Sequence, residues 1–223
     1  MVPQNIHQGL DKSNLKNHES RSSELVSHND SFLYPYYDIG YIRINNNCFG
    51  EKKGTGFFIT ENVSLISAHA AFSALCGFTS YASKEIAYHS EGGFPISHYP
   101  TIDAANIQVP NSFVINAVVT NPSDYAVLRF NASFSAAKHI LLAEYIQLDV
   151  GDEVSFIGYP IPSIETPGMT KYKDEFLPLE PSQFTIETPL AASQHGLSGS
   201  PVFANNDFIY AIGNVFGGST NDP

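Results

Sequence analysis

The apolar residues of this chain occur in short runs, and this spacing restricts its fold more than any other feature. From Phe32 onward most runs are about four to eight residues long and end at Gly, Pro, Asn or Asp, a pattern typical of β-strands joined by turns. Examples are TGFFIT, FVINAVVT, EVSFIGYP and FIYAIGNVF. An amphipathic helix would need a longer periodic segment. The sequence therefore predicts an all-β protein, with a barrel or a sandwich as its architecture.

The charge and the apolar content exclude several classes of function. Of the 223 residues, 22 are acidic and 11 are basic, which leaves a net charge of -11. This balance argues against binding to nucleic-acid backbones or to anionic lipid. No run reaches the roughly 18 apolar residues of a membrane helix, and the first residues lack the apolar centre of a signal peptide. Since a leader could have been removed, the compartment stays open.

The two cysteines, Cys48 and Cys76, limit the metal sites that the chain could form. Two thiolates are too few for a four-cysteine zinc site or an iron–sulfur cluster. One disulfide and two free thiols are both compatible with the sequence. We expect neither a metal nor another cofactor.

The composition changes abruptly at Phe32. Residues 1–31 are rich in Asn, Ser, His, Gln and Lys, and we expect them to form a polar, flexible arm outside the core. Residues 32–223 are expected to form the globular domain. Within it, residues 77–112 are polar and contain several glycines and prolines, so they are interpreted as loop-rich.

The string QHGLSGSPVF, residues 194–203, is the most informative for function. Glycines on both sides of Ser198 leave its hydroxyl uncovered, and the backbone amides of Gly196 and Ser198 could stabilise a tetrahedral oxyanion. The string differs from the G-x-S-x-G elbow of α/β-hydrolases, because an apolar strand follows it instead of a helix. A turn of this composition is by itself usually structural. It becomes a candidate nucleophile only if the chain also supplies a base.

A serine nucleophile requires a neighbouring histidine and a carboxylate that orients the histidine. His69, in the string SAHA, follows an apolar strand expected at residues 63–66, and Asp124, in DYAVL, begins an alternating strand. Asp103 is the alternative carboxylate, but the residues after it lack the apolar alternation that follows Asp124. We therefore favour Asp124.

Together these strings, in the order His, Asp, Ser, resemble the chymotrypsin-like serine proteases. GDEV and IGYP at residues 151–160, with SGSPVF at residues 198–203, are most similar to the bacterial glutamyl endopeptidase branch. The resemblance implies two packed antiparallel β-barrels of the six-stranded type, with their boundary near residues 131–145. It implies a secreted serine endopeptidase that acts on protein or peptide substrates through an acyl-enzyme. It assigns Ser198 as nucleophile, His69 as base, Asp124 as orienting carboxylate, and the Gly196 and Ser198 amides as oxyanion hole.

The same resemblance implies a specificity pocket. Val215 stands where the glutamyl branch has a histidine, so the sequence does not support glutamate specificity. Ala192, at the expected pocket floor, carries no charge to select Arg or Lys. The residues expected to contact substrate are Ala192, Ser193, His195, Val215, Phe216 and Gly217.

Two departures from the family pattern lead to further expectations. The family continues after the position of Gly218 with another strand and a helix, so either the chain given is cut short or the second barrel is closed unusually, without its last strand. We expect the arm, a neighbouring chain or further residues to cover that edge. Leu197 replaces an aspartate that pairs with a new N-terminal amine in trypsin-like enzymes. We expect Leu197 to order the oxyanion loop by packing instead. The alternatives are a catalytically silent protease fold used as a binding or host-targeting module, and an esterase on the same scaffold.

Overall fold

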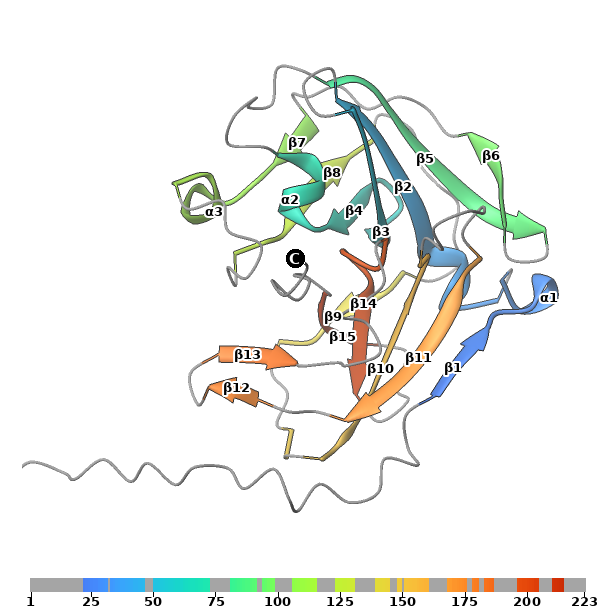
Figure 1. The fold of residues 1–223 in the computed structure, drawn as a ribbon, viewed down its shortest axis with the longest axis vertical. Helices are drawn as coiled ribbons and strands as arrows, with labels where there is room; N and C mark the ends of the chain where they lie inside the picture. The colour runs from blue at the N-terminus through green and yellow to red at the C-terminus, as the bar shows by residue number, and fades with distance from the viewer. Residues whose placement is uncertain are drawn as a thin grey trace, which may run out of the picture.

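The computed structural model consists mainly of β-strands in two sheets (Figure 1). It describes residues 22–31, 33–46, 50–72, 81–91, 94–98, 106–115, 123–130, 139–144, 148–149, 151–160, 168–175, 178–180, 183–186, 196–204 and 210–214. The few helices are short: α1 (His28–Ser31), the 3-10 helix η2 (Tyr36–Asp38), α2 (Ala68–Ala71) and α3 (Asn111–Ile115). The all-β class expected from the short apolar runs is confirmed. Among the described residues, no helix has the length and apolar character needed to span a bilayer.

The first sheet has seven strands in the order β6-β5-β2-β3-β4-β8-β7, and all of its pairs are antiparallel. Its strands are β2 (Ile39–Asn46), β3 (Gly50–Thr60), β4 (Val63–Ile66), β5 (Tyr81–Glu91), β6 (Phe94–His98), β7 (Ile107–Gln108) and β8 (Ala126–Arg129). The long hairpin of β2 and β3 is at its centre, and it keeps one register from Ile39 opposite Phe57 to Asn46 opposite Gly50.

The second sheet has six strands in the order β1-β11-β10-β14-β15-β9. Its strands are β1 (Ser22–Leu25), β9 (Leu141–Leu142), β10 (Glu153–Gly158), β11 (Thr170–Glu175), β14 (Pro201–Ala204) and β15 (Tyr210–Asn214). The pair of β15 and β9 is parallel, and the other pairs are antiparallel. A separate two-stranded sheet contains β12 (Pro178–Glu180) and β13 (Gln183–Ile186). In Figure 1 the second sheet lies below the first.

A shared apolar core joins the two sheets. Ile39, Tyr41 and Phe57 from the first sheet are buried in one cluster with Ile157 and Phe203 from the second. There are two further buried clusters, one built mainly from the first sheet and one around β10, β11 and β14. Burial of this much aromatic and aliphatic surface fixes how the two sheets pack, because each large side chain contributes about 1.5–3 kcal/mol. The functional residues described below lie where these two sheets meet.

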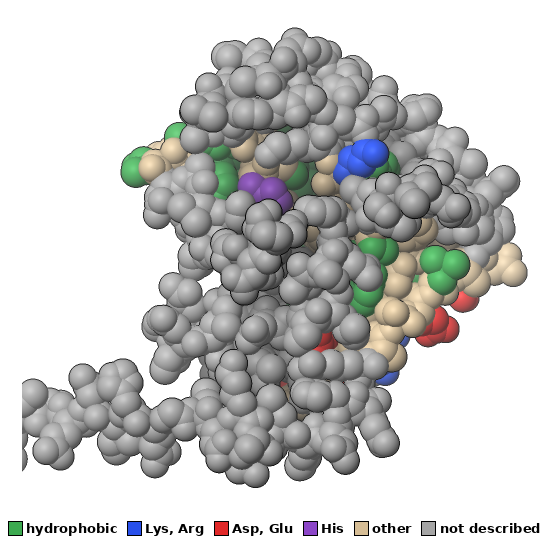
Figure 2. All heavy atoms as spheres, viewed as in Figure 1, with side chains coloured by type: hydrophobic (Ala, Val, Ile, Leu, Met, Phe, Trp, Pro, Cys, Tyr) green, Lys and Arg blue, Asp and Glu red, His purple; other side chains and the backbone are tan. Residues whose placement is uncertain are grey.

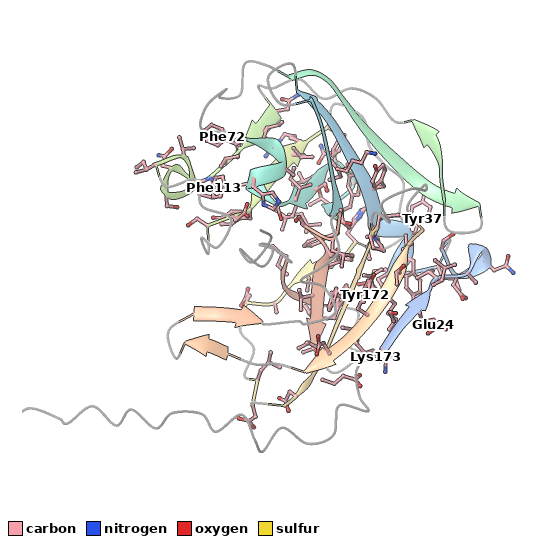
Figure 3. The ribbon with its side chains drawn as sticks, in the orientation of Figure 1. Glu24, Tyr37, Phe72, Phe113, Tyr172 and Lys173 are labelled. Atoms are coloured by element: carbon pink, nitrogen blue, oxygen red, sulfur yellow. The ribbon has the colours of Figure 1, made fainter. Side chains whose placement is uncertain are left out.

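The N-terminal segment differs from the sequence-based expectation in its last ten residues. Residues 22–31 were expected to lie outside the core, but β1 pairs with β11 from Ser22 opposite Lys173 to Leu25 opposite Thr170. Val26 is buried in the cluster that joins the sheets, and its amide donates to the Met169 carbonyl. Glu24 of β1 lies opposite Lys171 of β11, and Figure 3 labels Glu24 and Lys173 on these two paired strands. The edge of β11 offers backbone groups that a polar segment can pair with, whatever its composition.

Two other expectations about local structure are also wrong. The loop-rich stretch at residues 77–112 contains β5 and β6, because the free edge of β2 pairs with β5 through backbone groups that need no apolar alternation. The run FVINAVVT, residues 113–120, was expected to be a strand, but its first three residues belong to α3 (Asn111–Ile115), which follows Pro110, and the other five lie outside the described residues. Proline has a fixed φ that suits the residue before a helical turn, and its carbonyl accepts from Phe113 and Val114.

Candidate active site

The pairing of β4 with β8 brings His69 and Asp124 together. Ile66, at the end of β4, lies opposite Ala126, at the start of β8. The chain that leaves β4 into α2 therefore runs beside the chain that enters β8. His69 is three residues beyond Ile66 and Asp124 is two residues before Ala126, so the antiparallel register makes them neighbours.

Two hydrogen bonds connect His69 to Asp124. The Nδ1 atom of His69 lies 2.6 Å from Oδ2 of Asp124, and the backbone amide of His69 donates to Oδ1 at 2.8 Å. Asp124 is 1% exposed, whereas the His69 side chain is 22% exposed. An ionised carboxylate only accepts, so Nδ1 carries the shared proton and Nε2 is the acceptor nitrogen of the neutral ring. This is the tautomer that a general base requires.

Neighbouring contacts hold both residues of this pair. Phe72, directly after α2, packs edge-on against Phe113 of α3, with ring centroids 6.3 Å apart (Figure 3). Ser112 of α3 donates its hydroxyl to Ser123 at 2.7 Å, next to Asp124. Helix α3 therefore supports the histidine side and the aspartate side of the pair at once. In Figure 2 a histidine side chain reaches the surface over α2.

Ser198 lies in a tight turn that requires glycine. The amide of Ser200 donates to the Leu197 carbonyl at 2.9 Å, and Gly199, at the third position of this turn, has a φ of 92°. Such a φ is strained for any residue with a β-carbon, and a type II turn requires it at that position. Gly196 has a φ of 95°. Both glycines near Ser198 therefore adopt a positive φ, which residues with a β-carbon rarely adopt.

The nucleophile turn rests on β3. The amide of Thr55 donates to the Ser198 carbonyl at 2.8 Å, and the Thr55 hydroxyl donates to the Gly196 carbonyl at 2.8 Å. A β-carbon added to Gly54 would lie 3.0 Å from the Ser198 carbonyl oxygen and 3.9 Å from the β-carbon of Ala70. One added to Gly199 would lie 3.0 Å from the amide nitrogen of Ser67. The turn that carries Ser198 therefore lies close to Ser67, two residues before His69, and Gly54 of the supporting strand lies close to both Ser198 and Ala70.

Leu197 anchors the turn on its other side. Its side chain is buried with Val154, Phe156, Tyr172 and Val202 in the apolar cluster of the second sheet. Leu197 therefore packs as expected, and its role in ordering this loop stays a prediction. The turn is therefore fixed by hydrogen bonds to the first sheet and by apolar contacts to the second.

Several of the residues singled out from the sequence lie outside the described residues. They are the substrate-contact candidates Ala192, Ser193, His195, Val215, Phe216 and Gly217, the alternative carboxylate Asp103, and the cysteines Cys48 and Cys76. The described part of the chain contains no group of three or more His, Cys, Asp or Glu side chains that could hold a metal ion.

Sequence reasoning missed two features. Thr55 appeared only as the first residue of the string TGFFIT; its hydroxyl between Gly54 and Gly56 is a local signal, but it does not indicate which group the hydroxyl binds. The other is a second pair of acidic and histidine residues, in which Nδ1 of His139 lies 3.7 Å from Oδ1 of Asp38. Burial raises the pKa of Asp38 to about 7. Nothing in the string YYDIGY marks this aspartate as buried.

Comparisons with known proteins show the same fold in serine proteases. No protein-family model matches the sequence, and a search of curated proteins finds no match. The solved structure of a Glu endopeptidase in complex with MPD superposes with a TM-score of 0.66 at 16% identity, covering 88% of this chain and 85% of that one. A thermostable serine protease from an extremophilic microorganism gives 0.55 at 13% identity, covering 82% and 84%.

A third structure, a scabies mite inactivated protease paralogue, gives a TM-score of 0.64 at 12% identity and covers 90% of this chain and 89% of that one. An inactivated protease thus matches about as well as a Glu endopeptidase. The fold alone therefore does not decide whether a protein is catalytically active, because activity depends on the side chains at the site. What the comparisons and the two sheets establish together is that this chain has the chymotrypsin-like double β-barrel fold of the serine proteases.

Proposed function

We propose that this protein is a serine endopeptidase that hydrolyses peptide bonds through Ser198, His69 and Asp124. The observation that carries the proposal is the hydrogen-bonded pair of His69 and buried Asp124, together with the glycine-flanked Ser198 turn that is hydrogen-bonded to β3. An aspartate buried among apolar residues is costly unless its charge has a function or a partner. Here both carboxylate oxygens accept from His69.

The mechanism follows from the roles that these groups can take. Ser198 Oγ attacks the substrate carbonyl while Nε2 of His69 accepts the serine proton, and the resulting imidazolium gives that proton to the leaving amine. Asp124 keeps the ring oriented and stabilises its positive charge. The amides of Gly196 and Ser198 donate to the oxyanion of the tetrahedral intermediate. Water, activated by His69, then hydrolyses the acyl-enzyme and restores Ser198.

The register of β14 and β15 supports a binding groove for an extended peptide. Asn214, the last residue of β15, lies opposite Pro201, which is three residues after Ser198. The described part of β15 therefore ends beside the first residue of β14, the strand that follows the nucleophile turn. We propose that Val215, Phe216 and Gly217 pair with the substrate backbone there, because an extended peptide binds well to an exposed strand.

Ala192, Ser193 and His195 precede the nucleophile turn, and we propose that they line the pocket for the substrate side chain. Glutamate specificity is not part of the proposal, because Val215 offers no positive charge to an acidic side chain. Ala192 likewise gives no negative charge to select Arg or Lys.

The proposed partner is a protein or peptide substrate. The net charge of -11 argues against a nucleic-acid partner and against an anionic membrane surface. Secretion is proposed from the resemblance to the glutamyl endopeptidase branch alone. A catalytically silent binding or host-targeting module is the second candidate, since an inactivated paralogue shares the fold. The hydrogen bonds of His69 with Asp124 favour the active enzyme.

The deciding experiment is reaction with a fluorophosphonate probe, followed by peptide mapping of the labelled residue. We expect labelling at Ser198, loss of labelling in Ser198→Ala, and retention in Ser200→Ala. Ser200 is a matched control because it is two residues away and its buried hydroxyl has no hydrogen-bond partner in the described structure. An unlabelled parent protein, under conditions in which trypsin reacts, would contradict the proposal and support the silent module.

Specificity and reaction class need a second measurement. A peptide library read by mass spectrometry reports which bonds are cleaved, and matched ester and amide substrates separate a peptidase from an esterase. Turnover of the ester with none of the amide would exclude the peptidase.

A further inference from the structure

One buried hydroxyl connects the two sheets to the nucleophile turn. Thr55, in the middle of β3, is 0% exposed. Its Oγ1 atom accepts a hydrogen bond from the Tyr159 amide at 2.9 Å and donates one to the Gly196 carbonyl at 2.8 Å. Tyr159 directly follows β10 of the second sheet. Thr55 is thus in contact with both sheets and with the loop that carries Ser198.

The first of these bonds determines the direction of the second. A hydroxyl has one proton to donate, and the Tyr159 amide, which can only donate, occupies one of its lone pairs. The Thr55 proton is therefore directed at the Gly196 carbonyl. Because the site is buried, no water replaces either partner when the hydroxyl is lost, and both backbone groups stay unpaired.

Thr55 also holds the carbonyl on the other side of the turn. Its backbone amide donates to the Ser198 carbonyl at 2.8 Å, and the intervening Leu197 carbonyl accepts from the Ser200 amide. The three successive carbonyls of Gly196, Leu197 and Ser198 are therefore all bound, two of them by Thr55. Since each peptide unit is planar, fixing these three carbonyls also fixes the amides of Leu197, Ser198 and Gly199, and the Ser198 amide is one of the two proposed oxyanion donors.

We propose that Thr55 is a positioning residue for the oxyanion hole: its side chain and its amide together hold the backbone from Gly196 to Ser198 in the orientation that stabilises the tetrahedral intermediate. The proposal rests on the proposed peptidase function. It adds a residue that touches neither substrate nor reacting atoms and acts only through the turn.

Substitution at Thr55 separates the hydroxyl from the shape of the side chain. Thr55→Val keeps the branched shape and removes the hydroxyl, whereas Thr55→Ser keeps the hydroxyl. We expect Thr55→Val to lower kcat by about 10- to 100-fold with little change in KM, because a mispositioned donor costs part of the 10²–10³-fold that a deleted one costs. Thr55→Ser should stay close to the parent in kcat.

A transition-state analogue distinguishes positioning from a general structural role. A peptide boronate forms a tetrahedral adduct with the serine, so its affinity in Thr55→Val should fall by the same factor as kcat/KM. The affinity for a product-like peptide should not change. Ser64→Ala is the control for a lost buried hydroxyl, because Ser64 lies in β4 and donates only to its neighbour Leu65. It should change neither constant.

The hydrogen-exchange rates of the backbone amides in the nucleophile turn give a measurement that does not depend on catalytic activity. We expect faster exchange at Leu197 to Ser200 in Thr55→Val and parent-like exchange in Thr55→Ser. If Thr55→Val does not fold, Thr55→Ala compared with Thr55→Ser removes only the oxygen atom and answers the same question.

The outcomes separate the two claims. If exchange is faster in Thr55→Val than in the parent, but the parent reacts with neither probe nor boronate, the peptidase function is refuted and the role of Thr55 in holding the turn still stands. Equal kcat in Thr55→Val and the parent, equal exchange in both, or equal losses in the Val and Ser variants would overturn the role of the hydroxyl.

Discussion

Gly199→Ala tests whether the nucleophile turn is held as closely against β3 as the structure indicates. A β-carbon at this position would overlap the carbonyl oxygen of Thr55 and would lie 3.0 Å from the Ser67 amide nitrogen. Both obstacles are backbone atoms, which cannot rotate away. The turn must therefore move by about 1 Å, and rigid packing on both sides opposes that movement.

Two costs add up in this variant. Alanine at a φ of 92° costs about 1–2 kcal/mol, because its β-carbon crowds the neighbouring carbonyl. Displacing the turn also breaks the hydrogen bond from the Thr55 amide to the Ser198 carbonyl, which leaves buried groups unpaired at about 1–3 kcal/mol. We expect a loss of about 2–5 kcal/mol in the free energy of unfolding. A shift of about 1 Å at the nucleophile should lower kcat/KM by about 10²-fold.

Gly151→Ala is a matched control within the same chain. Gly151 also occupies the third position of a turn, closed by the bond from the Asp152 amide to the Asp149 carbonyl, and its φ is 93°. An added β-carbon meets nothing within 4 Å there. This variant therefore carries only the conformational cost, about 1–2 kcal/mol, and should keep the parent kcat/KM.

Urea unfolding at pH 7 gives the two free energies, and turnover of the best library peptide gives kcat/KM. The difference between the two variants isolates the close approach to Thr55, because the two glycines have nearly the same φ, 92° and 93°. Equal losses of stability, together with parent-like turnover in Gly199→Ala, would refute the reasoning.

Three further predictions follow from the site and the core. Ser198→Ala and His69→Ala should each lower kcat by about 10⁴- to 10⁶-fold without changing the melting temperature, and Asp124→Asn by about 10⁴-fold; retention of activity in any of them would contradict the assigned roles. Asp38→Asn should stabilise the protein at high pH only. Burial raises the pKa of Asp38 from 3.8 to about 7, so the folded protein holds this proton more tightly than the unfolded chain, and stability falls as the pH rises from about 4 to about 7. Asparagine carries no charge, so Asp38→Asn should raise the free energy of unfolding by up to about 4 kcal/mol at pH 8 and by almost nothing at pH 4. An equal gain at both pH values would show that the charge of Asp38 is not the cause. Val26→Ala should lower the free energy of unfolding by about 1–3 kcal/mol, because Val26 is buried in the core that joins the sheets, and urea denaturation that gives parent-like stability would disprove this anchoring.

The strands that sequence reasoning found are those whose own residues carry the signal. The runs at Val63–Ile66, Glu153–Gly158 and Pro201–Ala204 are apolar, are bounded by turn residues, and form β4, β10 and β14. By contrast, Tyr81–Glu91 is mainly polar and becomes β5 because β2 offers a free edge. Backbone pairing of this kind depends on a partner far along the chain, which local composition does not reveal.

Some residues of the candidate site could also be identified from local sequence, and others could not. His69, Asp124 and Ser198 could be selected because each stands in a characteristic local string, and the structure brings His69 and Asp124 into contact. Thr55 could not be selected for its role, since the Gly196 carbonyl that it binds is 141 residues away. Asp38 is marked only by burial, which depends on the packed fold.

The close approach of Gly54 to Ala70 would allow an engineered disulfide to place this site under redox control. The 3.9 Å between their β-carbon positions lies within the range of a disulfide, about 3.5–4.5 Å. The double variant Gly54→Cys/Ala70→Cys would therefore place a cleavable covalent link between β3 and the helix that carries His69. The new β-carbon at residue 54 would also press on the Ser198 carbonyl, 3.0 Å away. Oxidation and reduction of that one bond would then act on the histidine and the serine together, and would make the nucleophile responsive to the thiol balance of its surroundings.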